Sequence, residues 1–321
     1  MTSRRRFLAG AGLLAAAGTV NRAALAALPE PVIQTSAATA SPLTPPTGRP
    51  YDPVVTLNGW TAPWRMRNGV KEFHLVAEPV EREIAPGMVA RLWGYNGQSP
   101  GPTIEVVEGD RVRIFVTNRL PEHTTIHWHG QRLPNGMDGV GGLNQPHIPP
   151  GKTFVYEFTA RRPGTFMYHP HSDEMVQMAM GMMGLFIIHP KAGDHVDRDF
   201  ALILHNFALH PGTYRPDPAV MQDFDLWTFN SKVFPAIDSI VARTGERVRI
   251  RMGNLSMWNH PIHLHGMWSD LEDESGNFMV RKHTIDMPPG TRRSYRVTAD
   301  ALGRWAYHCH LLFHMDMGMF R

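Results

Sequence analysis

The only cysteine of this chain, Cys309, lies between two histidines near the C-terminal end. His314 follows five residues later and Met319 ten residues later. A thiolate, an imidazole and a weakly bound thioether are three of the four ligands of a blue-copper electron-transfer site, and a second imidazole completes that set. His260 is the natural candidate for the second imidazole, because it begins the nearby histidine-rich segment 260–265.

The histidines on either side of Cys309 indicate a second group of metal ligands. Successive side chains of a β-strand point to opposite faces. His308 and His310 would therefore face away from the metal that Cys309 binds, and could bind other metal ions behind it. Only a few covalent bonds would separate the two groups.

Paired histidines recur along the chain. Random placement of 18 histidines in 321 residues would give roughly one His-x-His pair. This chain has four, which are His127/His129, His169/His171, His263/His265 and His308/His310. One pair alone is a weak signal, because single histidines are often satisfied core residues. The four pairs together with Cys309, His314 and Met319 are a strong signal of a metalloprotein.

In this order, the histidines and the cysteine resemble the copper-binding motifs of multicopper oxidases. The motifs are His127-Trp128-His129-Gly130, His169-Pro170-His171, His260-Pro261-Ile262-His263-Leu264-His265 and the Cys309 segment. The resemblance implies four copper ions per chain: one type 1, one type 2 and a type 3 pair. It assigns His260, Cys309, His314 and Met319 to type 1, His127 and His263 to type 2, and His129, His169, His171, His265, His308 and His310 to type 3.

The resemblance also implies an activity, the one-electron oxidation of a reductant coupled to the four-electron reduction of dioxygen to water. Asp138 matches the family's acid near the type 2 copper, and we expect it to handle protons. Some relatives have a glutamate directly before the last type 1 histidine, where this chain has Phe313. Either Asp173 or Glu174 would then replace that glutamate, or proton delivery would be slower.

The reductant is not specified by the sequence. In this family it gives its electron near a type 1 histidine, so we expect it close to His260 or His314. Phenols, Cu(I), Mn(II) and amines all remain open. The nearby acids Asp270, Glu272 and Asp273 could attract a metal ion, but we favour an acidic surface loop.

The first 26 residues resemble a twin-arginine export signal. Three consecutive arginines, Arg4 to Arg6, precede an apolar stretch that ends in small residues around 24–26. This apolar stretch is too short to span a bilayer comfortably. The composition of residues 27–51 predicts a flexible linker. We therefore expect a periplasmic or secreted protein without a membrane span.

The charge of the rest of the chain excludes some partners. The formal charge of +3 falls to −1 when the four arginines of residues 1–26 are set aside. A near-neutral body gives no reason to expect nucleic acid or an anionic membrane surface as a partner. One cysteine also excludes an internal disulfide.

The body of the chain is a tandem duplication. Gly109 and Gly245 each lie 18 residues before a paired histidine, and so do Gly151 and Gly290. Short runs with alternating apolar side chains, such as 111–116, 154–158, 247–252 and 294–297, predict β-strands separated by turns. Many short strands predict an all-β Greek-key sandwich, which the resemblance narrows to two tandem cupredoxin domains. We call residues 52–190 the first unit and residues 198–321 the second unit.

The two units differ at the type 1 ligands. Aligned by sequence, His260, Cys309 and His314 lie opposite Thr124, Pro170 and Met175. The first unit therefore keeps only paired histidines. Methionines gather at 175–183, and their thioethers could bind Cu(I) in a copper-resistance role or pack an irregular core. The sequence leaves both interpretations open.

The resemblance is to two-domain members of the family, because the middle domain of three-domain relatives is absent. It implies a homotrimer in which the first unit of one copy meets the second unit of the next, although a monomer stays open. After Gly318 the second unit has only three more residues, so its last strand is expected to be short or missing. A truncated sequence would explain this, and Met319 would then be less rigidly held.

Two other functions compete with an oxidase. A copper-containing nitrite reductase also has two cupredoxin domains in a trimer, but it carries the blue copper in the first domain, the reverse of this chain. A periplasmic copper-binding protein without turnover would explain the methionines. It would not need eight histidines in register across both units.

Overall fold

The structure is a computed structural model that describes residues 33–34 and 51–321. All of these residues belong to one compact body, Pro31–Arg321, which contains both the first and the second unit. The predicted export signal, and the linker apart from residues 33–34 and 51, lie outside the described residues. No helix in the described part of the chain is both long enough and apolar enough to cross a membrane.

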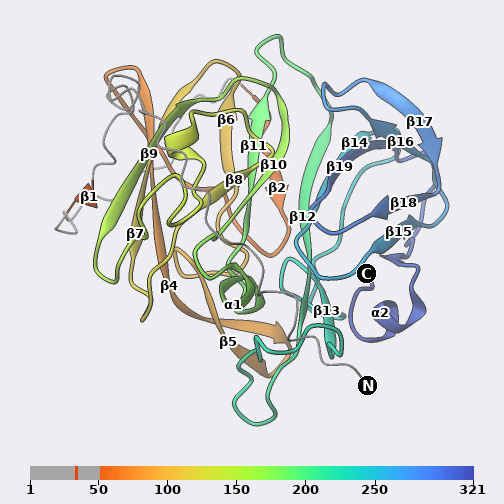
Figure 1. Ribbon diagram of the computed structural model, residues 1–321. Helices are drawn as coiled ribbons and strands as arrows, with labels where there is room; N and C mark the ends of the chain where they lie inside the picture. The colour runs from red at the N-terminus through yellow and green to blue at the C-terminus, as the bar shows by residue number, and fades with distance from the viewer. Residues whose placement is uncertain (1–32, 35–50) are drawn as a thin grey trace, which may run out of the picture. The chain divides into compact units, whose positions relative to one another are not determined.

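The first half of the described chain forms two β-sheets (Figure 1). Their strands are β1 (Ile33–Gln34), β3 (Arg65–Arg67), β4 (Val70–Ala85), β5 (Met88–Tyr95), β6 (Ile104–Val107), β7 (Arg111–Asn118), β8 (His127–His129), β9 (Thr153–Thr159), β10 (Gly164–His169) and β11 (Gly184–His189). The larger sheet has the order β1-β9-β7-β4-β3, with β5 paired to β4. The smaller sheet has the order β6-β11-β10-β8.

The second half, joined by the short strand β2 from the first half, forms two further sheets. Their strands are β2 (Val55–Thr56), β12 (Arg198–Phe207), β13 (Leu226–Phe229), β14 (Arg247–Asn254), β15 (His260–Leu264), β16 (Ser269–Glu272), β17 (Phe278–Lys282), β18 (Thr284–Met287), β19 (Arg292–Thr298) and β20 (Tyr307–Cys309). The larger sheet has the order β13-β12-β14-β19-β16-β17, with β2 paired to β12. The smaller has the order β18-β15-β20.

The same pairing pattern occurs in both units. In the first unit β7 pairs parallel with β4 and antiparallel with β9, and β8 pairs antiparallel with β10. In the second unit β14 pairs parallel with β12 and antiparallel with β19, and β15 pairs antiparallel with β20. The predicted all-β, duplicated fold is therefore confirmed.

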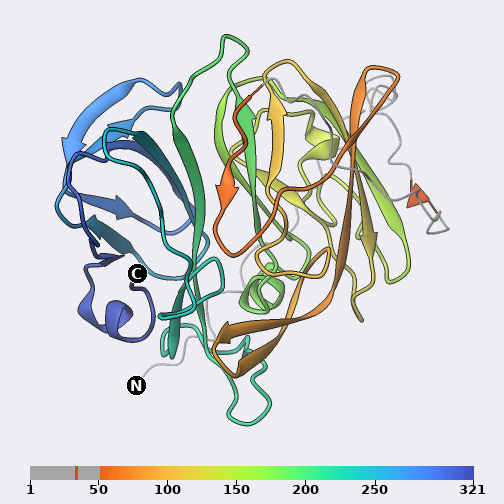
Figure 2. The same ribbon diagram turned by 180° about the vertical axis from the view of Figure 1, so that it is seen from behind.

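The two units pack against each other through apolar and polar contacts. Met167, Leu185 and Ile187 of the smaller first-unit sheet form one buried cluster with Ala201 and Ile203 of β12. Strand β12 lies between that sheet and the rest of the second unit in both views (Figures 1 and 2). This packing removes apolar surface of both units from water, which stabilises their association within the chain.

Strand β14 is buried on both faces, and polar groups at this junction are the partners of its buried arginines. Arg251 bonds to Asp199 in an ion pair, and its Nη1 donates to Thr165 Oγ1 of the first unit over 3.0 Å. Arg249 forms ion pairs with Asp199 and Glu272. Arginines at buried positions need such partners, because an unpaired buried charge is very costly.

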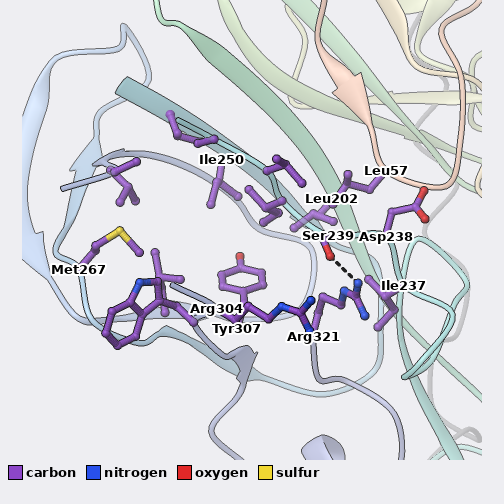
Figure 3. Close-up of a pocket in the computed structure, with 18 of the residues that line it drawn as sticks. Leu57, Leu202, Ile237, Asp238, Ser239, Ile250, Met267, Arg304, Tyr307 and Arg321 are labelled. Carbon is purple, nitrogen blue, oxygen red and sulfur yellow. Dashed lines mark hydrogen bonds between the residues drawn. The ribbon is translucent and has the colours of Figure 1, made fainter. Parts of the chain in front are cut away.

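The described residues of the second unit include only the start of a segment equivalent to β11. In the first unit β11 is completely buried, between β10 and β6. In the second unit Phe320 and Arg321 begin the equivalent pairing with β20, through His308 and Tyr307. A largely apolar cavity of about 520 Å³ lies beside Tyr307 and Arg321 (Figure 3). Residues 240–242, which correspond to part of β6, help to line it.

Three short helices are present in the described residues, and each follows a histidine-bearing or cysteine-bearing strand. They are η2 (Asn135–Met137), α1 (Glu174–Ala179) and α2 (Leu312–Asp316). Helix α1 follows β10, and α2 follows β20. The helices are too short to be stable alone, so the surrounding sheets hold them in place.

Candidate metal centres

Cys309, His260 and His314 form one buried group of donor atoms. The Cys309 sulfur lies 3.6 Å from His260 Nδ1 and 3.7 Å from His314 Nδ1, and the two nitrogens are 3.2 Å apart. Pairing of β15 with β20 brings Ile262 opposite Cys309, which carries His260 to the cysteine. Helix α2 supplies His314. The sequence-based grouping of these three side chains matches the structure.

Burial keeps these donors in the neutral form. It raises the pKa of the Cys309 thiol to about 12, and lowers the pKa of His260 to about 3 and that of His314 to about 4. Neutral imidazoles have a nitrogen lone pair available for a metal. A bound cation deprotonates a coordinating thiol outright. One soft sulfur with two imidazoles is the donor set that copper prefers in electron-transfer sites.

Met319 lies beside this group. It is completely buried, in the same apolar cluster as Cys309. Its carbonyl accepts a hydrogen bond from the Cys309 N–H at 3.1 Å, and its own N–H donates to the His314 carbonyl at 2.9 Å. The backbone of Met319 is thus tied to two of the three donors. Its assignment as the weakly bound thioether ligand stays a prediction.

The first unit contains a second group, made of His127, His129, His169 and His171. Pairing of β8 with β10 places His127 opposite His169. His129 Nδ1 is 3.2 Å from His169 Nε2, and the rings of His127 and His171 are 5.6 Å apart. Desolvation by burial lowers the pKa of His169 to about 3.

The second unit repeats this arrangement with His263, His265, His308 and His310. Pairing of β15 with β20 places His263 opposite His308. His265 Nε2 is 2.9 Å from His308 Nε2, and the His310 ring lies 5.6 Å from that of His263. His308 faces this group while Cys309 faces the other, as the alternation of side chains along β20 predicts.

The two histidine groups are separate within one chain. Within residues 51–321, each ring contact or hydrogen bond of these eight histidines to another histidine of the eight stays within one unit. His129 instead contacts the backbone of Gly290, in the turn between β18 and β19. A chain therefore presents two half-sets of ligands.

Backbone carbonyls orient two histidines in each half-set: His127 and His169 in the first, and His263 and His308 in the second. His127 Nδ1 donates to the Asp138 carbonyl at 2.7 Å, and His263 Nδ1 donates to the carbonyl of His283. In both rings Nε2 is left as the free acceptor nitrogen. Such outer contacts fix the tautomer and orientation of a metal-binding histidine. His283 was not predicted, because no sequence pattern marks a backbone acceptor.

Two carboxylates lie beside the first half-set. Asp138 Oδ1 is 3.6 Å from His127 Nδ1, and Asn144 Nδ2 donates to Asp138 Oδ2 at 3.2 Å. Glu174 has one oxygen 3.4 Å from His169 Nδ1 and the other 3.3 Å from His171 Nε2. Of the two acids that the sequence offered as substitutes for the missing glutamate, Glu174 is the one that contacts these histidines.

A cavity of about 500 Å³ opens beside His314. The stacked ring of Trp227, 4.5 Å from the His314 ring, and the exposed Phe313 form part of its wall. The acid in this wall is Asp223. Asp270, Glu272 and Asp273, for which we favoured a surface loop, do not line it. Asp270 pairs with Arg281 and Asp273 bonds to its own turn, but Glu272 is buried in ion pairs with two arginines and so is not part of an exposed loop.

One sequence-based alignment was wrong by two residues. The N–H of Met319 bonds to the His314 carbonyl, and the equivalent N–H of Met182 bonds to the Gln177 carbonyl. Gln177, not Met175, therefore lies opposite His314. The stretch from His169 to Gly181 in the first unit is two residues longer than the stretch from His308 to Gly318 in the second. An alignment with a constant offset from the histidines therefore misaligned the helices.

Two models of the multicopper oxidase family match this chain, one over residues 77–193 and the other over residues 211–321. Copper resistance protein A of Escherichia coli is 72% identical over 95 residues, which are 30% of this chain and 16% of that protein. The chain thus spans about one sixth of the length of the curated relative.

Solved structures match over much more of the chain. A blue copper oxidase from Nitrosomonas europaea is 32% identical, with a TM-score of 0.70, over 76% of this chain and 80% of that one. Another multicopper oxidase structure is 28% identical, with a TM-score of 0.73, over 82% of this chain and 93% of that one.

Proposed function

Because this chain belongs to the multicopper oxidase family, we propose that it oxidises a phenol or a metal ion such as Cu(I) and reduces dioxygen to water. The observation that carries this proposal is the position of β20. Its Cys309 reaches one donor group, while the adjacent His308 reaches the other. A covalent path of a few bonds therefore connects the two groups.

The donor atoms fit four copper ions per complete site. His260, Cys309 and His314 would hold type 1 copper, with Met319 as a fourth, weaker ligand. His127 and His263 would hold type 2 copper, and the remaining six paired histidines would hold the type 3 pair. Bound there, copper supplies one-electron redox chemistry and a place for dioxygen to react.

The chain's own residues would handle the protons that water formation consumes. Asp138 holds His127 in one tautomer through its carbonyl and keeps a carboxylate 3.6 Å away. We assign this carboxylate the proton-handling role. Glu174 spans His169 and His171 and is a second acid at the same half-set.

The separation of the two histidine groups supports a homotrimer. Within a chain the half-sets make no contact with each other in residues 51–321. Assembly of the first unit of one copy with the second unit of the next would complete the ligand set. A heterologous contact of this kind closes into a ring when the rotation permits it.

Cu(I) is the reductant that the comparison with copper resistance protein A favours. The methionine-rich segment adds little to this. Met180, Met182 and Met183 are buried in the core, and Met175 is the exposed methionine of the segment. Capture of Cu(I) by a row of exposed thioethers at 175–183 is therefore not supported.

We also propose export to the periplasm or beyond through the signal at 1–26.

The test is copper analysis, a visible spectrum and oxygen uptake on copper-loaded protein. We expect four copper ions per chain, an intense blue absorption from thiolate-to-copper charge transfer, and oxygen uptake with Cu(I) or a phenol. Blue protein that takes up no oxygen would indicate a copper-binding protein without turnover. Reduction of nitrite in place of dioxygen would support the nitrite reductase alternative.

A further inference from the structure

The imidazole of His260 is held at both of its nitrogens. Nδ1 faces the Cys309 sulfur and His314, whereas Nε2 lies 2.7 Å from the hydroxyl oxygen of Ser256. His260 is completely buried, and Ser256 is only 5% exposed. Water is therefore excluded as an alternative partner for Nε2, and the serine hydroxyl is the group that satisfies it.

The direction of this hydrogen bond follows from the position of the donor group. Nδ1 must carry a free lone pair if it is to bind a metal, so the proton of the neutral ring is on Nε2. Nε2–H then donates to Ser256 Oγ. The serine hydroxyl in turn donates to Asn254 Oδ1 at 2.6 Å or to the Trp258 carbonyl at 2.9 Å.

Asn254 fixes the orientation of the serine. It is completely buried, and its Nδ2 donates to the carbonyls of Trp258 and Met287. Its Oδ1 consequently points at Ser256, where it also accepts the Ser256 N–H at 2.9 Å. The serine hydroxyl is thus held by the ends of β14 and β18 before any metal arrives.

The other imidazole of this group has no such support. His314 is stacked on Trp227 and lies edge-on to Trp258 at 5.9 Å. In the described part of the chain no hydrogen bond is formed by its Nε2, and the residue borders the 500 Å³ cavity. The two histidines therefore differ: His260 is anchored by a buried polar chain, and His314 is positioned by aromatic rings.

We propose that Ser256 is a positioning residue for the copper ion held by His260, Cys309 and His314, and that it sets the reduction potential of that ion. This inference rests on the proposed function. A hydrogen bond from the distal N–H of a metal-bound imidazole fixes its tautomer and raises its basicity. A more basic ligand favours Cu(II) over Cu(I), so loss of the hydroxyl should raise the reduction potential.

The experiment compares Ser256→Ala, Ser256→Thr and the matched control Ser99→Ala. Ser99 is a buried serine of the first unit, like Ser256 in the second, and its hydroxyl donates to the Gly181 carbonyl at 2.6 Å. Three quantities are measured: the reduction potential from titration of the blue absorption, copper affinity by competition with a chelator, and the unfolding temperature of the copper-free protein.

We expect Ser256→Ala to raise the potential and to lower copper affinity by about 10- to 100-fold, the usual effect of losing such a contact. Ser256→Thr keeps the hydroxyl and should restore both quantities. Ser99→Ala should lower the unfolding temperature but leave the potential unchanged. If Ser256→Ala does not fold, Ser256→Val, which has nearly the shape of Ser256→Thr, removes the hydroxyl while filling the buried space and serves in its place.

The outcomes separate this inference from the proposed function. A normal potential and affinity in Ser256→Ala, with a loss of stability like that of Ser99→Ala, would make the serine purely structural. If the unsubstituted protein shows no blue absorption after copper loading, the proposed function fails and this inference fails with it.

Discussion

Equivalent positions in the two units carry different side chains and therefore different chemistry. In the second unit these positions carry His260, Cys309 and His314, three neutral donors that face one another. In the first unit Thr124 Oγ1 donates to Gln177 Oε1 at 2.6 Å. The backbone hydrogen bonds around the two positions are equivalent. A cupredoxin sandwich therefore supports either a metal site or a closed polar pair.

The first-unit pair leaves no donor free. Gln177 Nε2 also donates to Glu122 Oε1 at 2.7 Å and to the His123 carbonyl at 2.8 Å. All of the amide's polar atoms thus have partners, as buried polar groups require. The comparison teaches that the metal site depends on which side chains occupy these positions, because the backbone is shared.

Cys309→Ser should have the largest effect. The hydroxyl is similar in size but is a poor ligand for copper at this site, so we expect complete loss of the blue absorption and of oxygen uptake. The visible spectrum and an oxygen electrode measure both. The control change Thr124→Ser, at the first-unit position opposite His260, should preserve them. Blue colour in Cys309→Ser would place the type 1 site elsewhere.

Mixing two inactive variants tests whether the half-sets of different copies meet. His169→Ala damages the first-unit set and His308→Ala the second-unit set. In randomly mixed trimers about one quarter of the junctions would combine an intact first unit with an intact second unit. Co-expression should therefore restore about a quarter of the oxygen uptake. A monomer would recover none.

Acid should destabilise the copper-free protein, mainly through the second unit. Burial lowers the pKa of His260 to about 3 and those of His205 and His314 to about 4, against one comparable histidine, His169, in the first unit. The unfolded chain binds more protons below its histidine pKa of about 6.5. Stability is therefore present above pH 6.5 and is lost as the pH falls towards 4.

Urea unfolding at pH 7 and pH 5 measures this loss. Each such histidine can contribute up to about 1.4 kcal/mol per pH unit. In His205→Asn the amide retains a donor for the Leu255 carbonyl but does not titrate. The slope of the unfolding free energy with pH should then correspond to one proton fewer. An unchanged slope would exclude His205 as a contributor to the acid destabilisation.

Matched isoleucines test the difference in core packing. Ile104 is completely buried in β6, which pairs with β11 in the same sheet, whereas its counterpart Ile240 is half-buried on the cavity of the second unit. Ile104→Ala should lower the free energy of unfolding by about 2–5 kcal/mol, and Ile240→Ala by about 1 kcal/mol. Equal losses in denaturant unfolding would show that the cavity is filled in solution.

Gln177→Ala should have the smallest effect on function. It leaves the Thr124 hydroxyl and the Glu122 carboxylate without their amide partner, so we expect a loss of about 2–3 kcal/mol in stability. The blue absorption should not change. His314→Ala, at the equivalent position of the second unit, should abolish that absorption. A spectral change in Gln177→Ala would mean that the two positions are coupled.

The sequence by itself was enough to predict the candidate ligand types, their pairing and the duplicated all-β fold. Residues two apart on a strand share a face and adjacent residues do not. The spacing around Cys309 was therefore enough to predict two donor groups. The strands at 111–116 and 247–252 were predicted for the same reason, and β7 and β14 contain them.

Tertiary structure alone decided the contacts between distant segments. Ser256 beside His260, His283 beside His263 and Trp227 against His314 come from loops and strands that only packing brings together. The opposition of Gln177 to His314 was misread because the two loops differ in length. Local spacing specifies which face a side chain occupies. Its partners across the sandwich depend on how the sheets pack, and so does the separation of the two histidine half-sets.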